Sequence, residues 1–261
     1  MITQSLTRFS RITLDLEPPL ARIVLNNPPL NVIDIPMMDE LAEALTEIEA
    51  RVEISVLIIR GSQRAFSGGV DVAAHTPDKV EQMLAKFHRI IRALVGSKKV
   101  TIAAVHGHCL GGGAEIAMVC DLAFTSELAT WGFPEIKLGC YPPVAVTALA
   151  ALVGQKHAAD LVLTGRTISG REAASLGLAN AVVPEIDLDH AVQDAVHHLS
   201  QLSSATLAVT KKAIYGWDSI HFDKGLARAE KIYFEELMKT EDAQEGINAF
   251  LEKRPPVWKG K

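Results

Sequence analysis

The chain has 261 residues, 48% of them hydrophobic, with a formal net charge of −5 and an isoelectric point near 6.0. This length suits one large α/β domain or a domain with a small appendage. Because the basic residues form no block, nucleic acid and membrane surfaces are not expected partners. Three cysteines without metal-type spacing, and an amino-terminus without signal-peptide features, favour a reduced cytoplasmic protein. Glu115 and four glycines in the apolar stretch 100–120 argue against a membrane span.

The amino-terminal part of the chain predicts strands and a helix. Apolar residues alternate over 12–16 and again over 21–25, with a proline pair between them, which predicts a β-hairpin. A helix is expected to begin near Pro36. The continuous apolar run 56–59 is typical of a strand that is buried on both faces.

A longer helix is predicted next. Thr76 and Pro77 are expected to be its N-cap and first-turn residues, and apolar residues spaced by four and three over 80–94 form its buried face. Two more buried strands are expected at 101–105 and 121–125. Strands that alternate with helices predict βαβ units and a largely parallel α/β sheet.

The second half of the chain is predicted to be mainly helical. The glycine run 111–113 is expected to open a short helix, and the apolar segment 144–153 predicts a buried helix. The segment 169–172 has the sequence of a capping box, and 181–183 predicts a short strand. From residue 189 on, the pattern is helical without a convincing strand.

Two glutamates in apolar surroundings are the main candidates for catalysis. Glu115 is the one acidic or basic residue within 100–120, and Glu135 follows Pro134. Glutamate is rarely buried without a partner or a function, and apolar surroundings raise a carboxyl pKa toward the range that suits a general acid or base. Each glutamate also has a structural interpretation: Glu115 as part of a buried ion pair, and Glu135 as a cap for helix N–H groups.

Two glycine-rich loops are candidates for anion binding. The first spans 65–71, after the predicted strand 56–59, and the second is the run 111–113 at a helix start. Glycines allow a ligand to approach the backbone closely, and N–H groups without helical partners favour an anion. One N–H group from each loop would form an oxyanion hole. Such loops are also common as purely structural turns.

Five motifs occur in order along the chain, at 66–71, 102–121, 133–135, 163–165 and 245–253. Over nearly its whole length the sequence resembles the enoyl-CoA hydratase/isomerase (crotonase) superfamily. The resemblance implies an α/β fold, with a crotonase-like ββα superhelix as the core over residues 1–190. It also implies a helical C-terminal trimerisation region over 191–261, and hence a homotrimer or homohexamer.

The resemblance implies a role for each candidate residue. The backbone N–H groups of Val70 and Gly112 would bind the thioester oxygen as it becomes an enolate. Glu115 would activate water for attack on C3, and Glu135 would protonate C2, with the pair titrating as a coupled unit. Coenzyme A is part of the substrate, so neither a separate cofactor nor a metal is expected.

The resemblance also places residues against the acyl-CoA substrate. Those near the first glycine loop are Pro29, Leu30, Gly68, Gly69, Asp71, Val72 and Ala73. Phe250 and Lys253 would reach a CoA held by a neighbouring subunit, where Lys253 would supply a cation to the phosphates. Without the resemblance, a solvated helix face would be the preferred interpretation of Lys253.

The chain departs from the family pattern after Glu135. Pro143 stands where common hydratases have a glycine whose N–H helps to hold the catalytic water, and proline has no N–H. Residues 144–146 replace further small residues and narrow the same turn. This variant is similar to the branch that hydrates cyclohexa-1,5-diene-1-carbonyl-CoA. Trp131 and Tyr141 would suit a flat ring, and structural packing explains both aromatics equally well.

Three histidines have weaker interpretations. His106 and His108 stand two positions apart, so on one strand they would face the same way, and a metal site is conceivable. No cysteine or carboxylate partner is apparent nearby, and no metal site is predicted. His75 follows the first glycine loop, where a surface position is favoured over a place in the CoA channel.

The sequence therefore predicts a lyase that adds water to the double bond of an α,β-unsaturated acyl-CoA, in fatty acid or aromatic degradation, with a cyclic dienoyl-CoA as one candidate substrate. Two alternatives stay open. A Δ3,Δ2-enoyl-CoA isomerase needs a single base that moves a proton. A non-catalytic binding protein with the same fold would have lost catalytic motifs, whereas both loops and both glutamates are present here.

Overall fold

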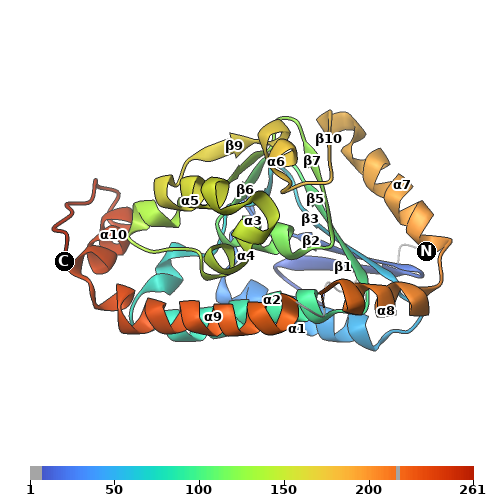
Figure 1. The fold of residues 1–261 in the computed structure, drawn as a ribbon, viewed down its shortest axis with the longest axis horizontal. Coiled ribbons are helices and arrows are strands. Elements are labelled where there is room, and N and C mark those ends of the chain that lie inside the picture. Colours follow the sequence, from blue (N-terminus) through green and yellow to red (C-terminus); the bar gives the residue numbers. More distant parts are fainter. Residues whose placement is uncertain (1–7, 216–217) are drawn as a thin grey trace.

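The computed structural model describes residues 8–215 and 218–261 and contains two β-sheets (Figure 1). The larger sheet has the strand order β1-β2-β3-β5-β7-β10. Its strands are β1 (Ile12–Glu17), β2 (Leu20–Leu25), β3 (Val56–Gly61), β5 (Val100–Val105), β7 (Leu122–Ser126) and β10 (Ala181–Val183). β1 pairs with β2 in antiparallel fashion, and the other neighbouring strands are parallel. The predicted hairpin, buried strands and largely parallel sheet are confirmed.

A smaller sheet with the order β4-β6-β8-β9 lies beside the first. Its strands are β4 (Ala65–Ser67), β6 (His108–Leu110), β8 (Thr130–Gly132) and β9 (Thr167–Ser169). β4, β6 and β8 each follow a strand of the larger sheet, and a helical segment follows each of them. This repeated strand–strand–helix unit is the expected superhelix. Because β4, β6 and β8 run parallel, the loops that leave their carboxyl ends meet at one edge of the sheet.

Helices cover both faces of the larger sheet. α1 (Ile35–Ala50) and α2 (Val80–Gly96) pack on one face, and α7 (Leu188–Ser200) packs on the other. Side chains alternate along a strand, so Leu57 and Ile59 of β3 join the core with α1 and α2, while Val56 and Ile58 pack with α7. α7 begins at Leu188 and therefore runs across the domain boundary expected at residue 190.

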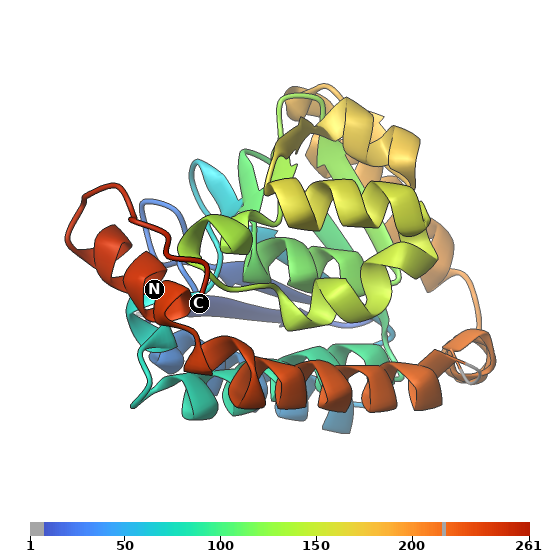
Figure 2. The ribbon, with the colours of Figure 1, turned by 60° about the vertical axis from the view of Figure 1, so that its left-hand side comes forward.

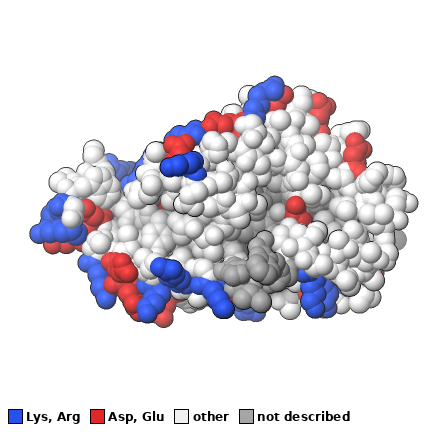
Figure 3. All heavy atoms as spheres, viewed as in Figure 1, with Lys and Arg blue, Asp and Glu red and all other residues white. Residues whose placement is uncertain are grey.

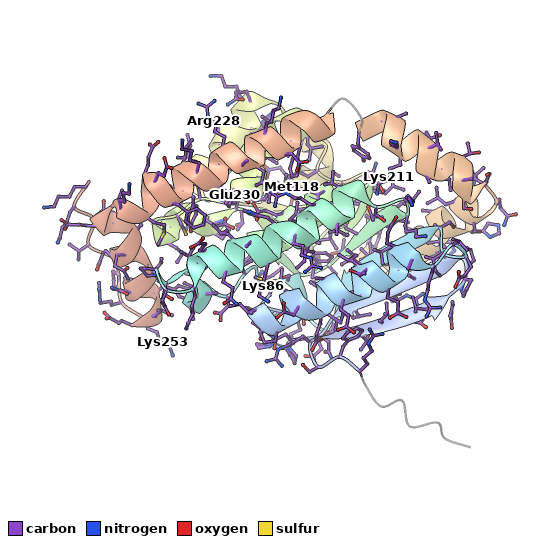
Figure 4. The ribbon with its side chains drawn as sticks, turned by 90° about the horizontal axis from the view of Figure 1, so that it is seen from below. Lys86, Met118, Lys211, Arg228, Glu230 and Lys253 are labelled. Carbon is purple, nitrogen blue, oxygen red and sulfur yellow. The ribbon has the colours of Figure 1, made fainter. Side chains whose placement is uncertain are left out.

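The carboxyl-terminal helices lie along the edge of this core. They are α8 (Ser204–Tyr215), α9 (Asp218–Glu235) and α10 (Glu241–Leu251). α9 lies beside α2 and contacts α4 (Pro143–Val153), and Figures 2 and 4 show it as a long rod next to α2. His88 of α2 and Glu230 of α9 join the two helices, with 2.6 Å between Nδ1 and Oε1. The described residues after 189 contain no strand, as predicted.

The remaining helical segments are short. The α-helices are α3 (Gly112–Val119), α5 (Gln155–Thr164) and α6 (Gly170–Leu176), and the 3-10 segments are η1 (Val72–His75), η2 (Pro134–Leu138), η3 (Glu185–Asp187) and η4 (Leu237–Lys239). The predicted opening of a helix by the run 111–113 is confirmed in α3. The hydroxyl of Ser169 accepts the N–H of Glu172 at 3.2 Å, so the predicted cap of α6 is also present.

Two predictions about helices were wrong in detail. α2 begins at Val80, and its N-cap is Lys79. Thr76 and Pro77 belong to a preceding turn, in which the carbonyl of Thr76 accepts the backbone N–H groups of Lys79 and Val80. α4 is not buried all round. Its residues Val146 and Leu152 are 44% and 43% exposed, while the opposite side of the helix packs in the core.

The two neighbouring histidines do not share a strand. β5 ends at Val105 and β6 begins at His108, and Gly107 between them has a φ of +56° that turns the chain. His106 is buried with its Nε2 3.1 Å from the Gln63 carbonyl, whereas His108 is exposed. The idea that the two imidazoles face the same way is therefore wrong.

The surface of the molecule is unevenly charged. On the face seen in Figure 3, charged side chains lie mainly along the edges, and the centre is largely uncharged. Exposed apolar residues of α4 contribute to this region. Within residues 8–215 and 218–261, no helix combines the length and the apolar character that crossing a bilayer requires.

Candidate active site

Glu115 lies on the inner side of α3, and the start of another helix holds its carboxylate. Its Oε1 accepts the backbone N–H groups of Val144 and Ala145, each at 2.9 Å. These N–H groups belong to the first turn of α4, where they have no helical acceptor and where the helix dipole favours negative charge. Glu115 is 3% exposed. Because backbone amides hold its carboxylate, the ion-pair interpretation of Glu115 is not supported.

Glu135 lies on η2, and its carboxylate faces Gly111. A Cβ atom at position 111 would lie 2.5 Å from Glu135 Oε1, and the φ of +50° there also favours glycine. The glycine therefore makes room for the carboxylate. Glu135 Oε2 is buried and has no hydrogen-bond partner in the described part of the chain. An unpaired buried carboxylate oxygen is costly for folding, so its retention indicates a function.

The two carboxyl groups have raised pKa values for related reasons. Burial is the largest cause for both, because removal from water disfavours the charged form. The two amides that bind Glu115 oppose this effect, whereas the negative charge of Glu115 raises the pKa of Glu135 further. The pair therefore holds a proton near neutral pH and titrates as one unit.

Two backbone N–H groups without an acceptor in the described residues lie beside the carboxylates. Val70 forms an isolated parallel bridge in which the Gly69 carbonyl and the Asp71 N–H pair with Ile33, so the Val70 N–H points away from Ile33. Gly112 is the first residue of α3, where an N–H has no helical acceptor. A Cβ atom at Gly112 would lie 2.6 Å from Val70 Cγ2, so the glycine permits the close approach of the two loops.

A cavity of about 70 Å³ brings these groups together. Part of its wall comes from the loop after β4 and from α3 and η2, which meet because they follow β4, β6 and β8 at one edge of their sheet. The rest comes from η1, α2, α4 and α9. The site residues predicted from the sequence that line it are Gly68, Gly69, Val70, Val72, Gly112, Glu115, Glu135, Tyr141 and Pro143.

The cavity also has walls that sequence reasoning did not assign to it. His75 lines it, so the preference for a plain surface position of His75 was wrong. Leu84 and Phe87 of α2 line it too, and the apolar periodicity of that helix marked them as buried without indicating what they face. Tyr233 of α9 completes the wall, and no pattern in the sequence pointed to it.

Trp131 does not line this cavity. Its side chain is completely buried, and its indole N–H donates to the hydroxyl of Thr125 at 2.9 Å. On β8 it pairs with Cys109 of β6 and Ile168 of β9, inside the smaller sheet. The packing interpretation therefore fits Trp131, whereas Tyr141 lies at the cavity.

Several residues expected to contact CoA lie around the cavity and not in its wall. Leu30, next to Pro29, accepts the N–H of Gly68 through its carbonyl at 2.7 Å, which fixes that segment against the glycine loop. The carboxylate of Asp71 accepts the N–H of Ala73 at 3.0 Å and caps η1. These contacts stabilise the backbone that presents the Val70 N–H.

Phe250 and Lys253 lie at the end of the chain, apart from the cavity. Phe250 is 53% exposed on α10, and Lys253 follows this helix with an exposed side chain. Figure 4 shows Lys253 at one end of the molecule. α10 packs against η1, which begins two residues after Val70, and against η2, which carries Glu135.

A second cavity of about 700 Å³ adjoins the first. Mainly apolar side chains of α4 and α9 line it, and Met118, labelled in Figure 4, lines it from the end of α3. Tyr141 borders both cavities, and its hydroxyl donates to the carbonyl of Ala229 on α9 at 2.6 Å. The larger cavity offers space for an apolar group next to the carboxylate pair.

Comparison with known proteins identifies a family. Residues 16–261 match the model of the enoyl-CoA hydratase/isomerase family. The chain is 33% identical over 251 residues to cyclohexa-1,5-dienecarbonyl-CoA hydratase of Thauera aromatica, covering 96% of this chain and 97% of that protein. It is 35% identical over 260 residues to 2,3-dehydroadipyl-CoA hydratase of Escherichia coli K12, covering 96% and 95% respectively.

The fold is similar to those of solved structures with related activities in their names. An enoyl-CoA hydratase from Mycobacterium avium subsp. paratuberculosis K-10 superposes with a TM-score of 0.87 at 26% identity, covering 96% of this chain and 99% of that one. A methylmalonyl-CoA decarboxylase in complex with 2-nitronate-propionyl-CoA superposes with a TM-score of 0.83 at 26% identity, covering 97% and 100%.

Proposed function

The chain belongs to the enoyl-CoA hydratase/isomerase family, and we propose that it adds water across the double bond of an α,β-unsaturated acyl-CoA. The observation that carries this proposal is the pair Glu115 and Glu135, both buried at one cavity beside two backbone N–H groups without acceptors. A hydratase needs a base for water and an acid for carbon, whereas an isomerase needs one group that moves a proton.

The geometry suggests how the reaction proceeds. The thioester oxygen receives the N–H groups of Val70 and Gly112, each worth about 3 kcal/mol as negative charge develops there. Glu115 takes a proton from water as the water oxygen bonds to C3, and the electrons of the double bond move into the enolate. Glu135 then gives its proton to C2. The raised carboxyl pKa of Glu135 keeps that proton available near neutral pH.

The acyl group we propose is a compact ring, as in cyclohexa-1,5-diene-1-carbonyl-CoA. The Thauera aromatica relative bears that substrate in its name. Pro143, Tyr141 and Tyr233 line the same cavity, and the two tyrosine rings meet edge to face with 5.2 Å between their centroids. Aromatic edges and faces suit a flat unsaturated ring better than a flexible chain.

The CoA moiety is proposed to lie against the loop that carries Asp71 and Ala73 and against the Pro29–Leu30 segment. Phe250 and Lys253 are proposed to contact the CoA of a neighbouring subunit in a homotrimer or homohexamer. The exposed positions of both side chains leave them available for such a contact. Lys253 would then supply a cation to the nucleotide phosphates.

A substrate panel in ¹⁸O-labelled water tests the function. We expect hydration of both crotonyl-CoA and cyclohexa-1,5-diene-1-carbonyl-CoA, with one ¹⁸O atom in each hydroxyacyl product by mass spectrometry and a higher kcat/KM for the cyclic substrate. Movement of a double bond without label would establish an isomerase instead. Absence of turnover with every thioester that binds would establish a binding protein. A preference for crotonyl-CoA would overturn the cyclic substrate but not the hydratase.

A further inference from the structure

The α4 side of the cavity has no backbone donor left for a water molecule. Pro143, the first residue of α4, lines the cavity but has no N–H. The next two N–H groups, of Val144 and Ala145, both donate to Glu115 Oε1. A donor that holds the attacking water must therefore come from another element.

Two tyrosine hydroxyls are alternative donors. Tyr141 and Tyr233 both line the cavity. The hydroxyl of Tyr141 is already used, because it donates to the carbonyl of Ala229 at 2.6 Å. The hydroxyl of Tyr233 is buried and has no hydrogen-bond partner in the described part of the chain. The two rings touch edge to face, so the same aromatic pair presents one satisfied and one unsatisfied hydroxyl.

The position of Tyr233 is fixed by packing. Its side chain is 1% exposed, and its ring packs against Tyr141 and against Phe234 at 6.0 Å. The Cys140 thiol is a polar neighbour of the hydroxyl, but sulfur is a weak acceptor and no hydrogen bond of normal geometry joins the two groups. Burial is the main cause that raises the pKa of Tyr233, so the hydroxyl stays protonated and can donate. A buried hydroxyl without a partner costs about 1–3 kcal/mol. Such a cost at a cavity wall indicates a partner that arrives with the reaction.

We propose that the Tyr233 hydroxyl donates a hydrogen bond to the attacking water, in place of the backbone N–H that Pro143 lacks. The proposal rests on the hydratase function proposed above. Water would give one hydrogen to Glu115 and one to Glu135, whose Oε2 is also without a partner. It would accept the Tyr233 hydrogen with one lone pair, which leaves the second lone pair for C3. The two carboxyl groups and the tyrosine hydroxyl would thus form three hydrogen bonds with the water and orient its free lone pair toward C3.

The Tyr233→Phe variant tests this role. We expect kcat for hydration to fall about 10- to 100-fold with KM within about twofold, because the ring remains and one water contact is lost. Exchange of the C2 proton of butyryl-CoA with D₂O should keep its wild-type rate. That reaction needs the oxyanion hole and Glu135 but no attacking water. Hydration by the wild-type protein is measured alongside, so a failure of the hydratase proposal shows itself separately.

Matched variants complete the experiment. Thr46→Val removes an exposed hydroxyl of α1 that donates to the carbonyl of Ala42 and lines neither cavity, and should change hydration less than twofold. Pro143→Gly in the Tyr233→Phe background returns a backbone N–H at position 143 and should restore hydration at least about fivefold.

Three results would overturn the role of Tyr233. Hydration at the wild-type rate in Tyr233→Phe would show that the hydroxyl is not needed to hold the water. An equal fall in hydration and C2 exchange would show that the residue supports the fold of the site in general. If Pro143→Gly/Tyr233→Phe hydrated no faster than Tyr233→Phe, the hydroxyl would not be a replacement for the backbone N–H that Pro143 lacks.

Discussion

Two carboxylates in and just after α3 have opposite surroundings. Asp121, after the helix, has both hydrogen-bond donors and a cation as partners. Its Oδ2 accepts the N–H and hydroxyl of Thr101 at 2.7 and 2.9 Å and lies 2.7 Å from Lys211 Nζ. Lys211 also donates to the carbonyl of Lys99 at 2.9 Å, so the pair joins α8 to the larger sheet.

Glu115, inside the helix, has amide partners on one oxygen and shares its cavity with Glu135, which has an oxygen without any partner among the described residues. Burial of the first carboxylate is offset by neighbouring groups, so its role is structural. Burial of Glu115 and Glu135 is not fully offset by partners, so the pKa values of both carboxyl groups are raised. Complete partners thus mark a carboxylate that supports the fold, and incomplete ones mark a carboxylate available for chemistry.

The largest effect that would sharpen this contrast is expected at the glutamate pair. Glu115→Gln and Glu135→Gln should each lower kcat by roughly 10²–10⁴-fold, because an amide cannot take up or give the proton. Glutamine at position 115 still offers an oxygen to Val144 and Ala145, so the melting temperature should not fall. Steady-state kinetics and thermal unfolding on the same samples measure both effects. Full activity in either variant would contradict the mechanism.

At the ion pair of Asp121 and Lys211, we expect a substitution to lower stability and to leave activity nearly unchanged. Lys211→Met should lower the free energy of unfolding by about 3 kcal/mol, because it removes a buried cation and leaves the partly buried Asp121 without its partner. The kcat of the folded protein should stay within about twofold. Denaturant unfolding checks the first expectation. The double variant Asp121→Asn/Lys211→Met is the control and should recover part of the lost stability. If Lys211→Met abolished activity without loss of stability, the contrast between the two regions would fail.

Much of the fold was predictable because local patterns decide it. The alternation at 12–25 and the run 56–59 predicted strands correctly, and the glycines at 111–113 predicted the start of α3. What escaped prediction depends on orientation across the whole chain. Trp131 is close to Glu135 in sequence, yet its position on β8 directs it into the smaller sheet.

The hydrogen bonds of Glu115 and the position of Tyr233 could not be predicted from the sequence. The sequence showed that Pro143 lacks an N–H group, but not that the next two amides both bind Glu115. Tyr233 lies far along the chain on α9, and its place in the cavity depends on how that helix crosses α2 and α4. A tyrosine on a helix gives no local signal that distinguishes packing from contact with a substrate.

The smallest expected effect is a pH dependence of stability that belongs to the glutamate pair. In the unfolded chain these carboxyls ionise near pH 4.3, whereas both pKa values are raised in the folded protein. Above about pH 4.3 the unfolded state therefore binds fewer protons than the folded state, so stability falls as pH rises until the folded-state pKa values are passed. Relative to Glu135→Gln, the wild-type protein should lose up to about 1.4 kcal/mol per pH unit between about pH 5 and pH 7.

Urea unfolding of both proteins across that pH range measures the effect. Carboxyls such as Glu40 and Glu245 have lowered pKa values and give the opposite trend only below about pH 4.3. They are also common to both proteins and cancel in the difference. The double variant Asp121→Asn/Lys211→Met serves as the comparison, because it removes both charges of that ion pair, leaves the glutamate pair intact and should follow the wild-type slope. A difference between wild type and Glu135→Gln that stays constant with pH would mean that Glu135 ionises normally, and its role as the proton donor to C2 would then lose its physical basis.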